Sequence, residues 1–358
     1  MKGISVEDRD ERPRIALTMG DVAGVGPELI ARGWGDPPLL ALSRPFVVGN
    51  RLILQRALDL VGSVAKVRTI TRPEDAEPGD ATIPCLEASG EELSEVRPGF
   101  VDPRAGRAAY DFLIAATDLA LAGRIDAITT LPLNKEALHS GGILHPGHTE
   151  VLAERCGTPD HAMMLYLGSP GAGDEAGLGV VHVTLHVALR DVFRMITEES
   201  VYSKILLADR ALRPLTGGRP PRVAVAALNP HAGEGGLFGD EEKRLIEPAV
   251  TRASRTGVLV VGPIAADTLF ARAIAGEFDA VVAMYHDQGH VALKTLGFDR
   301  AVNITLGLPI VRTSVAHGTA YDIAWKGRAE TSSLIEAVRV AARLVQGRKG
   351  EKSPLVEA

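Results

Sequence analysis

The sequence predicts an α/β protein with the layers of an α/β/α sandwich, organised as two domains or as one large α/β unit. Short apolar runs alternate with Ala-rich amphipathic stretches, and Gly or Pro residues mark the turns between them. The 358 residues are too many for one small binding module and suggest two domains. Hydrophobic residues make up 46% of the chain and charged residues 23%, which excludes a disordered chain or a scaffold held by disulfides.

Each predicted strand is an apolar run bounded by a polar turn or by Gly or Pro. Each predicted helix repeats apolar residues at the spacing that gives a helix one buried face. Because the two kinds of element alternate, we expect parallel βαβ units, whose ligands bind beyond the carboxyl ends of the strands. The expected strands are 14–19, 45–50, 126–133, 178–187, 221–230, 257–263 and 278–286. The expected helices are 27–34, 51–62, 109–123, 241–257 and 267–276.

Charge and cysteine content exclude several kinds of partner. A net charge of −6 gives no basic face for nucleic acid, and no segment approaches the roughly 18 consecutive apolar residues of a membrane span. The first residues are charged and lack the apolar stretch of a signal peptide. Cys85 and Cys156 are too few for a disulfide framework. We therefore expect a cytoplasmic protein with no nucleic-acid or membrane partner.

Histidines follow three of the predicted strands. His186, His231 and His286 lie in or beside turns that contain Gly, Asn or Asp. Neutral imidazole is the commonest metal ligand in proteins, and three imidazoles with an open position make a catalytic divalent-metal site. A structural histidine with an ordinary hydrogen bond is an equally weighted interpretation. His182 and His290 each lie four residues from one of these candidates and are alternative ligands.

Basic and polar side chains among apolar residues indicate an anion site. The segment 289–314 carries Lys294, Asn303 and Arg312, and such groups at strand ends suit a phosphate or carboxylate. Thr149 precedes a helical stretch, where a hydroxyl and backbone N–H groups bind anions. Solvated surface charges and a simple N-cap at Thr149 are the alternatives. The glycine-rich segment 20–28 fits neither common nucleotide-binding pattern, so a tight turn is expected there.

Seven motifs together resemble one enzyme family. TMGDVAGVGPE, PGHTE, LNPHAGEGG, AADTLF, MYHDQG, NITLGLPIVRTS and AHGTAYDIAWKG occur in this order, within residues 14–345. They are similar to the motifs of the 4-hydroxythreonine-4-phosphate dehydrogenases of pyridoxal phosphate biosynthesis. Seven ordered motifs over nearly the whole chain are far more specific than any one of them alone.

The resemblance implies a fold, cofactors and an assembly. The implied fold has two α/β/α sandwich domains with a cleft between them, like isocitrate and isopropylmalate dehydrogenases, with residues 14–160 and 300–345 in the first domain. Residues 161–299 would form a second domain that carries metal ligands and dimer contacts. The family uses NAD and a divalent metal, for which Zn, Mg and Co are candidates. It also forms homodimers with shared active sites, in which the partner supplies one metal ligand.

Most of the expected site residues are those that match the family's motifs. Asp267, in AADTLF, matches an acidic residue near the metal, and the turn 317–327 matches a segment that wraps the adenosine of NAD. The oxidation also needs a base for the hydroxyl proton. Lys135 is the candidate for that role, with a plain surface lysine as the alternative. The other matched positions are His186, His231 and His286 for the metal, His148, Thr149, Lys294, Asn303 and Arg312 for the substrate, and His317, Gly318, Ala320 and Asp322 for the cofactor.

The implied reaction is an NAD-dependent oxidative decarboxylation of a small phosphorylated hydroxy acid. The first expectation is 4-phosphohydroxy-L-threonine, which would give 3-amino-2-oxopropyl phosphate and CO₂. Departures from the family pattern at Met19, Val22, Val25 and Asn134 point instead to catabolic relatives. These oxidise D-threonate or D-erythronate 4-phosphate to dihydroxyacetone phosphate, or act on phthalate-type cis-dihydrodiols. A non-enzymatic anion-binding protein and a metal hydrolase without NAD are the competing classes.

Overall fold

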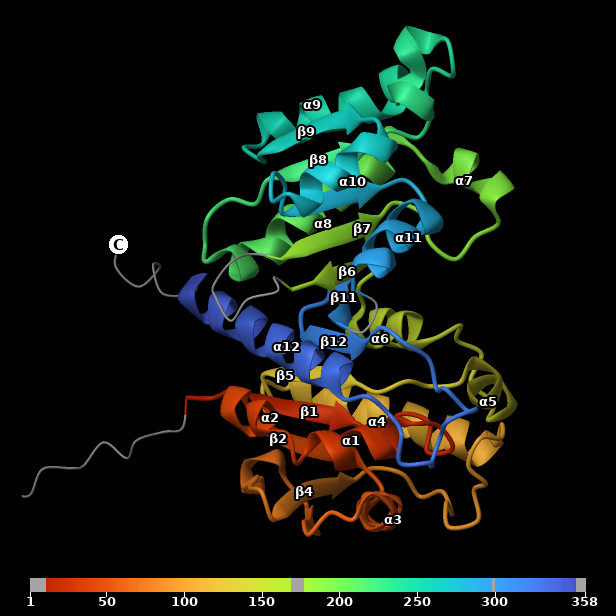
Figure 1. Ribbon diagram of the computed structural model, residues 1–358, viewed down its shortest axis with the longest axis vertical. Coiled ribbons are helices and arrows are strands. Elements are labelled where there is room, and N and C mark those ends of the chain that lie inside the picture. Colours follow the sequence, from red (N-terminus) through yellow and green to blue (C-terminus); the bar gives the residue numbers. More distant parts are fainter. Residues whose placement is uncertain (1–10, 169–176, 298–299, 352–358) are drawn as a thin grey trace, which may run out of the picture.

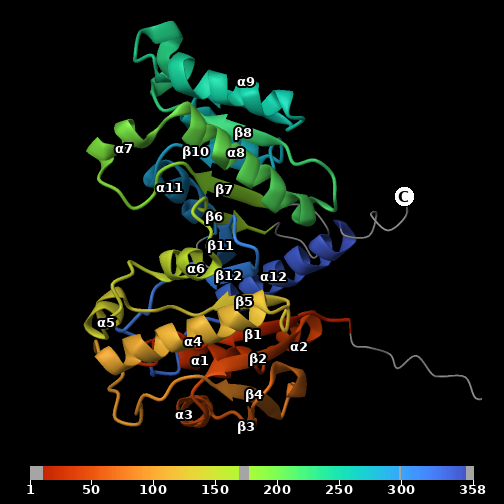
Figure 2. The ribbon, with the colours of Figure 1, turned by 180° about the vertical axis from the view of Figure 1, so that it is seen from behind.

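The computed structural model describes residues 11–168, 177–297 and 300–351. In these residues, twelve strands join into one continuous sheet that runs the length of the molecule (Figure 1). Helices cover both faces of this sheet, as the front and back views show (Figures 1 and 2). The predicted α/β class is therefore confirmed. The strands across the sheet are β3 (Lys66–Ile70), β4 (Thr82–Glu87), β2 (Arg44–Gly49), β1 (Arg14–Thr18), β5 (Ala127–Thr130), β12 (Val311–Val315), β11 (Ala301–Leu306), β6 (Ala162–Leu167), β7 (Leu178–His182), β10 (Ala280–Ala283), β8 (Val223–Ala226) and β9 (Val260–Ile264).

The helices begin and end where local chemistry favours it. The helices are α1 (Gly26–Gly33), α2 (Pro37–Leu42), α3 (Arg51–Val61), α4 (Pro103–Leu121), α5 (Lys135–Ser140), α6 (His148–Cys156), α7 (Leu189–Met195), α8 (Glu198–Leu212), α9 (Glu247–Arg255), α10 (Ala266–Ile274), α11 (His286–Gly297) and α12 (Ser332–Glu351). Asn50 caps α3 by accepting hydrogen bonds from two of its first backbone N–H groups, and Gly62 ends it with a left-handed φ of 69°. Thr197 and Ser200 form a reciprocal capping box at the start of α8.

The centre of the sheet is antiparallel, whereas the sequence pattern predicts parallel units throughout. β11 pairs antiparallel with β12 and with β6, and β6 pairs antiparallel with β7. The reason is the length of the connections: residues 307–310 alone join β11 to β12, while a parallel pair needs a crossover of roughly a dozen residues or more. On both sides of this centre the neighbouring strands are parallel, as expected.

The sheet continues across both borders predicted between the domains. β6 begins just after the border at 160 and 161, and β11 begins just after the border at 299 and 300. The two strands pair along their whole length, from Ala301 opposite Leu167 to Leu306 opposite Ala162. The hairpin β11–β12 therefore connects the half of the sheet with edge strand β3 to the half with edge strand β9. The division into 14–160 with 300–345 and 161–299 stays a prediction.

Two helices illustrate the three layers of the fold. α12 packs against β5, β11 and β12 and lies in front of the sheet in Figure 1. The hydroxyl of Thr313 in β12 donates to the carbonyl of Ala337 in α12 at 2.9 Å, so this side of the hairpin is closed. α4 packs against β1, β2 and β5 and lies in front in the reversed view of Figure 2. Together they bury the apolar strands between them, as an α/β/α sandwich requires.

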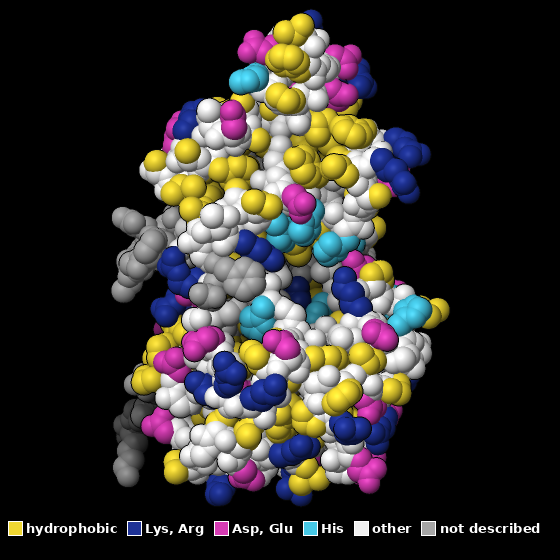
Figure 3. Space-filling model, turned by 45° about the vertical axis from the view of Figure 1, so that its right-hand side comes forward, with side chains coloured by type: hydrophobic (Ala, Val, Ile, Leu, Met, Phe, Trp, Pro, Cys, Tyr) yellow, Lys and Arg dark blue, Asp and Glu magenta, His cyan; other side chains and the backbone are white. Residues whose placement is uncertain are grey.

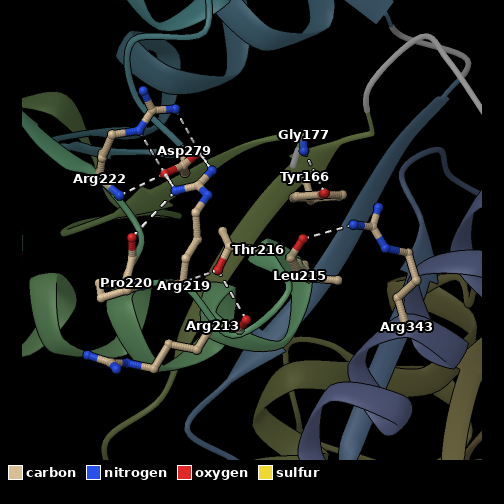
Figure 4. Close-up of polar contacts among 10 residues, drawn as sticks. All are labelled: Tyr166, Gly177, Arg213, Leu215, Thr216, Arg219, Pro220, Arg222, Asp279 and Arg343. Atoms are coloured by element: carbon tan, nitrogen blue, oxygen red, sulfur yellow. Dashed lines mark hydrogen bonds and ion pairs between the residues drawn. The ribbon is translucent and has the colours of Figure 1, made fainter. Parts of the chain in front are cut away.

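Asp279 ties together the amino ends of β8 and β10. Its carboxylate is 2% exposed and accepts hydrogen bonds from the guanidinium groups of Arg219 and Arg222 at 2.6–3.2 Å (Figure 4). The backbone N–H of Arg222 donates to it as well, at 2.7 Å. Burial alone would raise the pKa of the Asp279 carboxyl, but these hydrogen bonds hold it at about 2.

Replacing Asp279 by Ala is expected to lower the free energy of unfolding by about 2 kcal/mol, because two half-exposed arginines lose a buried acceptor. The folded pKa lies below the ordinary value of 3.8, so this stability is present above that value and is lost as pH falls toward about 2. Urea unfolding of both proteins across this pH range measures the difference. The exposed pair of Asp191 with Arg194 supplies the control, since Asp191→Ala should change little. Equal urea midpoints for wild type and Asp279→Ala at neutral pH would contradict the expectation.

Candidate active site

A cavity of about 490 Å³ opens at the edge of the sheet where β5, β7 and β12 end. The start of α6 and the beginning of β6 complete its walls. Figure 3 shows histidines and basic side chains gathered around a hollow between the two halves of the molecule. Eight of the residues predicted for the site line this cavity: Lys135, His148, Thr149, His186, Asn303, Arg312, His317 and Gly318.

The other predicted site residues lie outside this lining. Ala320 and Asp322 follow in the turn after β12, with a left-handed φ of 45° at Ala320 and an exposed Asp322. Lys294 lies in the last turn of α11. Asp267 is exposed in the first turn of α10, a helix that contacts the segment Pro230–Gly236. The full set outside the lining is His231, Asp267, His286, Lys294, Ala320 and Asp322.

Arg312 is a buried cation on the cavity wall. It is 4% exposed, and its guanidinium donates to the hydroxyls of Thr305 and Thr130 at 2.9 and 2.6 Å. Both acceptors are neutral, and within the described residues its Nε has no hydrogen-bond partner. Burial lowers the pKa of Arg312 to about 10, which still leaves it charged at neutral pH. A buried cation held by neutral groups favours binding of an anion beside it.

The start of α6 adds polar groups to the same cavity. The helix begins at His148 after the cap residue Gly147, so Thr149 lies in the first turn and is not the N-cap. Burial and the nearby charge of Arg312 hold the pKa of His148 well below its usual value, so this imidazole is neutral at pH 7. A neutral imidazole, a hydroxyl and the unpaired N–H groups of a helix start suit a phosphate.

Lys135 is the first residue of α5 and lies on the cavity wall. His186 lines the same cavity, and burial, and after it the charge of Lys135, lowers the pKa of His186. Asn134, one of the departures from the family pattern, caps α5 by accepting a hydrogen bond from the backbone N–H of Ala137 at 2.8 Å. The departure at Asn134 therefore has a local structural reason in helix capping.

Two of the predicted metal ligands come together within one chain. β7 ends at His182 and is shorter than the predicted run 178–187, so His186 lies in the loop beyond it. The ring centroids of His186 and His286 are 5.8 Å apart. Tetrahedral binding with metal–nitrogen distances of roughly 2 Å would place two ring centroids about 5 Å apart, close to this spacing. Nδ1 of His286 pairs with the carboxylate of Asp287 at 2.7 Å, which leaves Nε2 for an ion.

The third predicted ligand, His231, is not brought to this pair. Within the described residues, no three His, Cys, Asp or Glu side chains form a group that could hold a metal ion. His231 is exposed in a loop after β8, in which residues 231–235 all have left-handed φ values of 44–79°. Buried Glu242 holds the base of the loop by accepting hydrogen bonds from the backbone N–H groups of Leu228 and Asn229. Left-handed φ is strained for non-glycine residues, so the surrounding contacts must impose this conformation.

Two residues that the sequence did not single out also line the cavity. His161 immediately precedes β6, and Lys204 on α8 donates to the carbonyl of His161 at 3.0 Å. Lys204 also pairs with the carboxylate of Asp160 at 3.1 Å. The apolar run AMMLYL at 162–167 is a signal for β6, and a strand predicted there would have placed His161 at a strand end.

The turn 317–327 packs against the glycine-rich segment 20–28. The hydroxyl of Tyr321 donates to the buried carboxylate of Asp21 at 2.6 Å, and the indole of Trp325 donates to the carbonyl of Val22 at 2.9 Å. A Cβ on Gly24 would lie 2.9 Å from the turn, so the close approach requires glycine. The segment 20–28 is therefore a support for the predicted cofactor turn.

Comparisons with known proteins give relatives over nearly the whole chain. A family model described as pyridoxal phosphate biosynthetic protein PdxA matches residues 41–341. The 4-hydroxythreonine-4-phosphate dehydrogenase of Trichlorobacter lovleyi is 45% identical over 340 residues, 94% of this chain and 99% of the relative. The D-threonate 4-phosphate dehydrogenase of Cupriavidus necator is 46% identical over 341 residues, 95% of this chain and 98% of the relative. The crystal structure of 4-hydroxythreonine-4-phosphate dehydrogenase from Klebsiella pneumoniae is similar with a TM-score of 0.82 and 45% identity, covering 93% of this chain and all of that one.

Proposed function

The chain belongs to the pyridoxal phosphate biosynthetic protein PdxA family and is a dehydrogenase, and from this premise we propose that it oxidatively decarboxylates a four-carbon hydroxy acid 4-phosphate. The observation that carries the proposal is the buried cation Arg312, held by two neutral hydroxyls on the wall of a cavity that His186 also lines. Arg312 and the start of α6 would bind the phosphate. The acid would then extend toward His186 and the cofactor turn.

The reaction breaks three bonds of the substrate: C3–H, the O–H of the C3 hydroxyl, and C1–C2. A hydride leaves C3 while the C3 hydroxyl loses its proton, and the C1–C2 bond of the resulting β-keto acid then breaks to release CO₂. When bound, NAD⁺ accepts the hydride and a divalent ion stabilises the negative charge on the C3 oxygen. We assign Lys135 as the base for the hydroxyl proton and as the acid that returns a proton to C2. Its place on the cavity wall near His186 supports this assignment.

The histidines fit a divalent metal if two chains share the site. One chain would supply His186 and His286, and His231 of the partner subunit would complete the set. The exposed loop of His231 supports this arrangement, because its neighbours Leu237 and Phe238 are 74% and 47% exposed. On α7, Leu189, Phe193 and Met195 are exposed as well. Exposed apolar side chains in these two segments would be covered in a subunit interface, so we propose a homodimer with shared active sites.

The charged residues that line the cavity favour some of the candidate substrates over others. Among the described lining residues, Lys135 and Arg312 are cationic, Lys204 is already paired with Asp160, and Glu150 is the one carboxylate. D-Threonate and D-erythronate 4-phosphate carry a hydroxyl at C2, where 4-phosphohydroxy-L-threonine carries an ammonium group. A wall with excess positive charge favours the more anionic ligand, so we rank these two acids above 4-phosphohydroxy-L-threonine. A phthalate-type dihydrodiol ranks lowest because it has no phosphate for Arg312.

The test is NADH formation with D-threonate 4-phosphate, D-erythronate 4-phosphate, 4-phosphohydroxy-L-threonine and a phthalate-type dihydrodiol, with and without a divalent ion. We expect metal-dependent NADH and CO₂ formation, and the largest kcat/KM with one of the two hydroxy acids. Glu150→Gln should raise the KM for 4-phosphohydroxy-L-threonine relative to the KM values for the other two phosphates, because only its ammonium group loses the one carboxylate of the described lining. The absence of NADH with all four compounds would overturn the proposal, and a preference for the dihydrodiol would overturn the phosphate assignment.

A cytoplasmic location, expected from the sequence, remains part of the proposal. In the part of the chain that the structure describes, none of the helices has the length and apolar character of a membrane span.

A further inference from the structure

Two largely buried histidines lie beside the predicted metal ligand His286, and one of them, His182, also lines the cavity. His182 ends β7 and is 3% exposed, and His290 lies one turn along α11 from His286 and is 7% exposed. Nδ1 of His290 and Nε2 of His182 share a hydrogen bond of 3.1 Å. The ring of His290 stacks on that of His286, with centroids 3.9 Å apart and planes tilted by 9°. The three imidazoles therefore form one connected group.

Stability does not account for this histidine pair. Taking two polar rings out of water costs free energy, and their one shared hydrogen bond offsets a part of that cost. Within the described residues, Nδ1 of His182 has no hydrogen-bond partner. Two leucines would fill a similar volume and would bury no polar atoms. A buried polar pair that costs stability beside a candidate site points to a role in that site.

Close packing of α11 on β7 fixes the pair in place. A Cβ on Gly289 would lie 2.5 Å from Nε2 of His182 and 2.6 Å from the side chain of Val180. Glycine is thus required here for the close approach of the helix to the strand. With α11 held at this distance, the ring of His290 has little room to turn, and the ring of His286 rests on it.

We infer that His182 and His290 are positioning residues that set the orientation of His286 toward the divalent ion. Asp287 holds the edge of the His286 ring through Nδ1, and His290 holds its face. His182 in turn holds His290 through their hydrogen bond. Contacts behind a ligating histidine fix its ring orientation and raise metal affinity. The inference rests on the proposed function, because it presumes that His286 binds a metal.

The test compares Co²⁺ binding by the full-length chain without substrate. Affinity is measured by competition with a chelator, geometry by the visible absorption of bound Co²⁺, and stability by urea unfolding of the metal-free protein. For His182→Leu/His290→Leu we expect a roughly 10-fold or larger loss of Co²⁺ affinity and an altered absorption spectrum. The urea midpoint of the metal-free variant should be unchanged or higher. His139→Leu, which removes an exposed imidazole on α5, is the matched control and should behave as wild type.

A second variant shows whether the loss of Co²⁺ affinity comes from the lost ring stacking on His286 or from a general loss of packing. His182→Leu/His290→Phe keeps an aromatic face against His286 without the hydrogen bond, and it should recover part of the lost affinity. A folded double-leucine variant with wild-type Co²⁺ affinity and spectrum would overturn the inference alone. Failure of the double-leucine variant to fold would overturn it too, because the pair would then serve stability. A wild-type protein that binds no Co²⁺ would instead refute the metal site of the proposed function, and the inference with it.

Discussion

His186→Ala and His231→Ala proteins are each expected to lack dehydrogenase activity, while a mixture of the two should regain about one quarter of the wild-type activity. The expectation follows from a two-fold symmetric dimer in which His186 and His231 reach one site from different subunits. Random pairing makes about half of the dimers mixed. Each mixed dimer has one site with all three ligands and one site with a single ligand. The measurement is metal-dependent NADH formation by the co-expressed mixture; the mixed dimer, purified through a different affinity tag on each chain, should show about half of the wild-type activity.

The matched control for this experiment is the mixture of His186→Ala with His286→Ala. These two histidines have ring centroids 5.8 Å apart within one chain, so every site of the mixed dimer lacks one of them. This mixture should stay inactive. Recovery in the control, or no recovery with His231→Ala, would show that the three histidines are divided between the subunits in another way. A protein that remains monomeric and active would refute the shared site altogether.

The sequence could predict the class of the fold because several parallel strands, among them β1, β2, β5, β8 and β10, are apolar runs between helices; the edge strand β3 and its neighbour β4 were not predicted, since β3 (KVRTI) is largely exposed. The centre escaped the prediction, since an antiparallel pairing there depends on which strands become neighbours. The hairpin turn at 307–310 nevertheless carries a local signal, because a Gly–Leu–Pro turn is too short for a parallel crossover. β6, which also pairs antiparallel with its neighbours, was missed as well. With it, the position of His161 on the cavity wall was missed.

Motifs predicted which residues form the candidate site, but they could not give the contacts among them. Thr149 has the side chain of a helix cap, yet Gly147 takes that position and leaves the threonine in the first turn. His182 and His290 each lie four residues from a predicted ligand, but their pairing across β7 and α11 depends on tertiary packing. His231 shows the limit most clearly, since its proposed metal partners belong to another chain.

Arg312→Met is expected to lower kcat/KM about 1,000-fold, or about 4 kcal/mol, while leaving the fold intact. The loss has this size because a buried, charge-assisted pair with the phosphate would disappear. Binding energy of the phosphate holds the reacting carbon in place, so kcat as well as KM should suffer. Initial rates of NADH formation with the preferred phosphorylated acid measure both constants. Arg312→Lys keeps the charge but loses the paired donors, so it should recover part of the activity.

The stability of Arg312→Met without ligand distinguishes a phosphate-binding role of Arg312 from a structural role in the hairpin β11–β12. Burial lowers the folded pKa of Arg312 below its ordinary value, to about 10, so folding disfavours its charge at every pH below about 10. Removing the charge should therefore leave the thermal midpoint unchanged or raise it, with no dependence on pH between about 6 and 9. Inorganic phosphate should raise the midpoint of the wild type and not that of the variant. A variant that loses stability but keeps its response to phosphate would show that Arg312 supports the hairpin β11–β12 and that the phosphate binds elsewhere in the cavity.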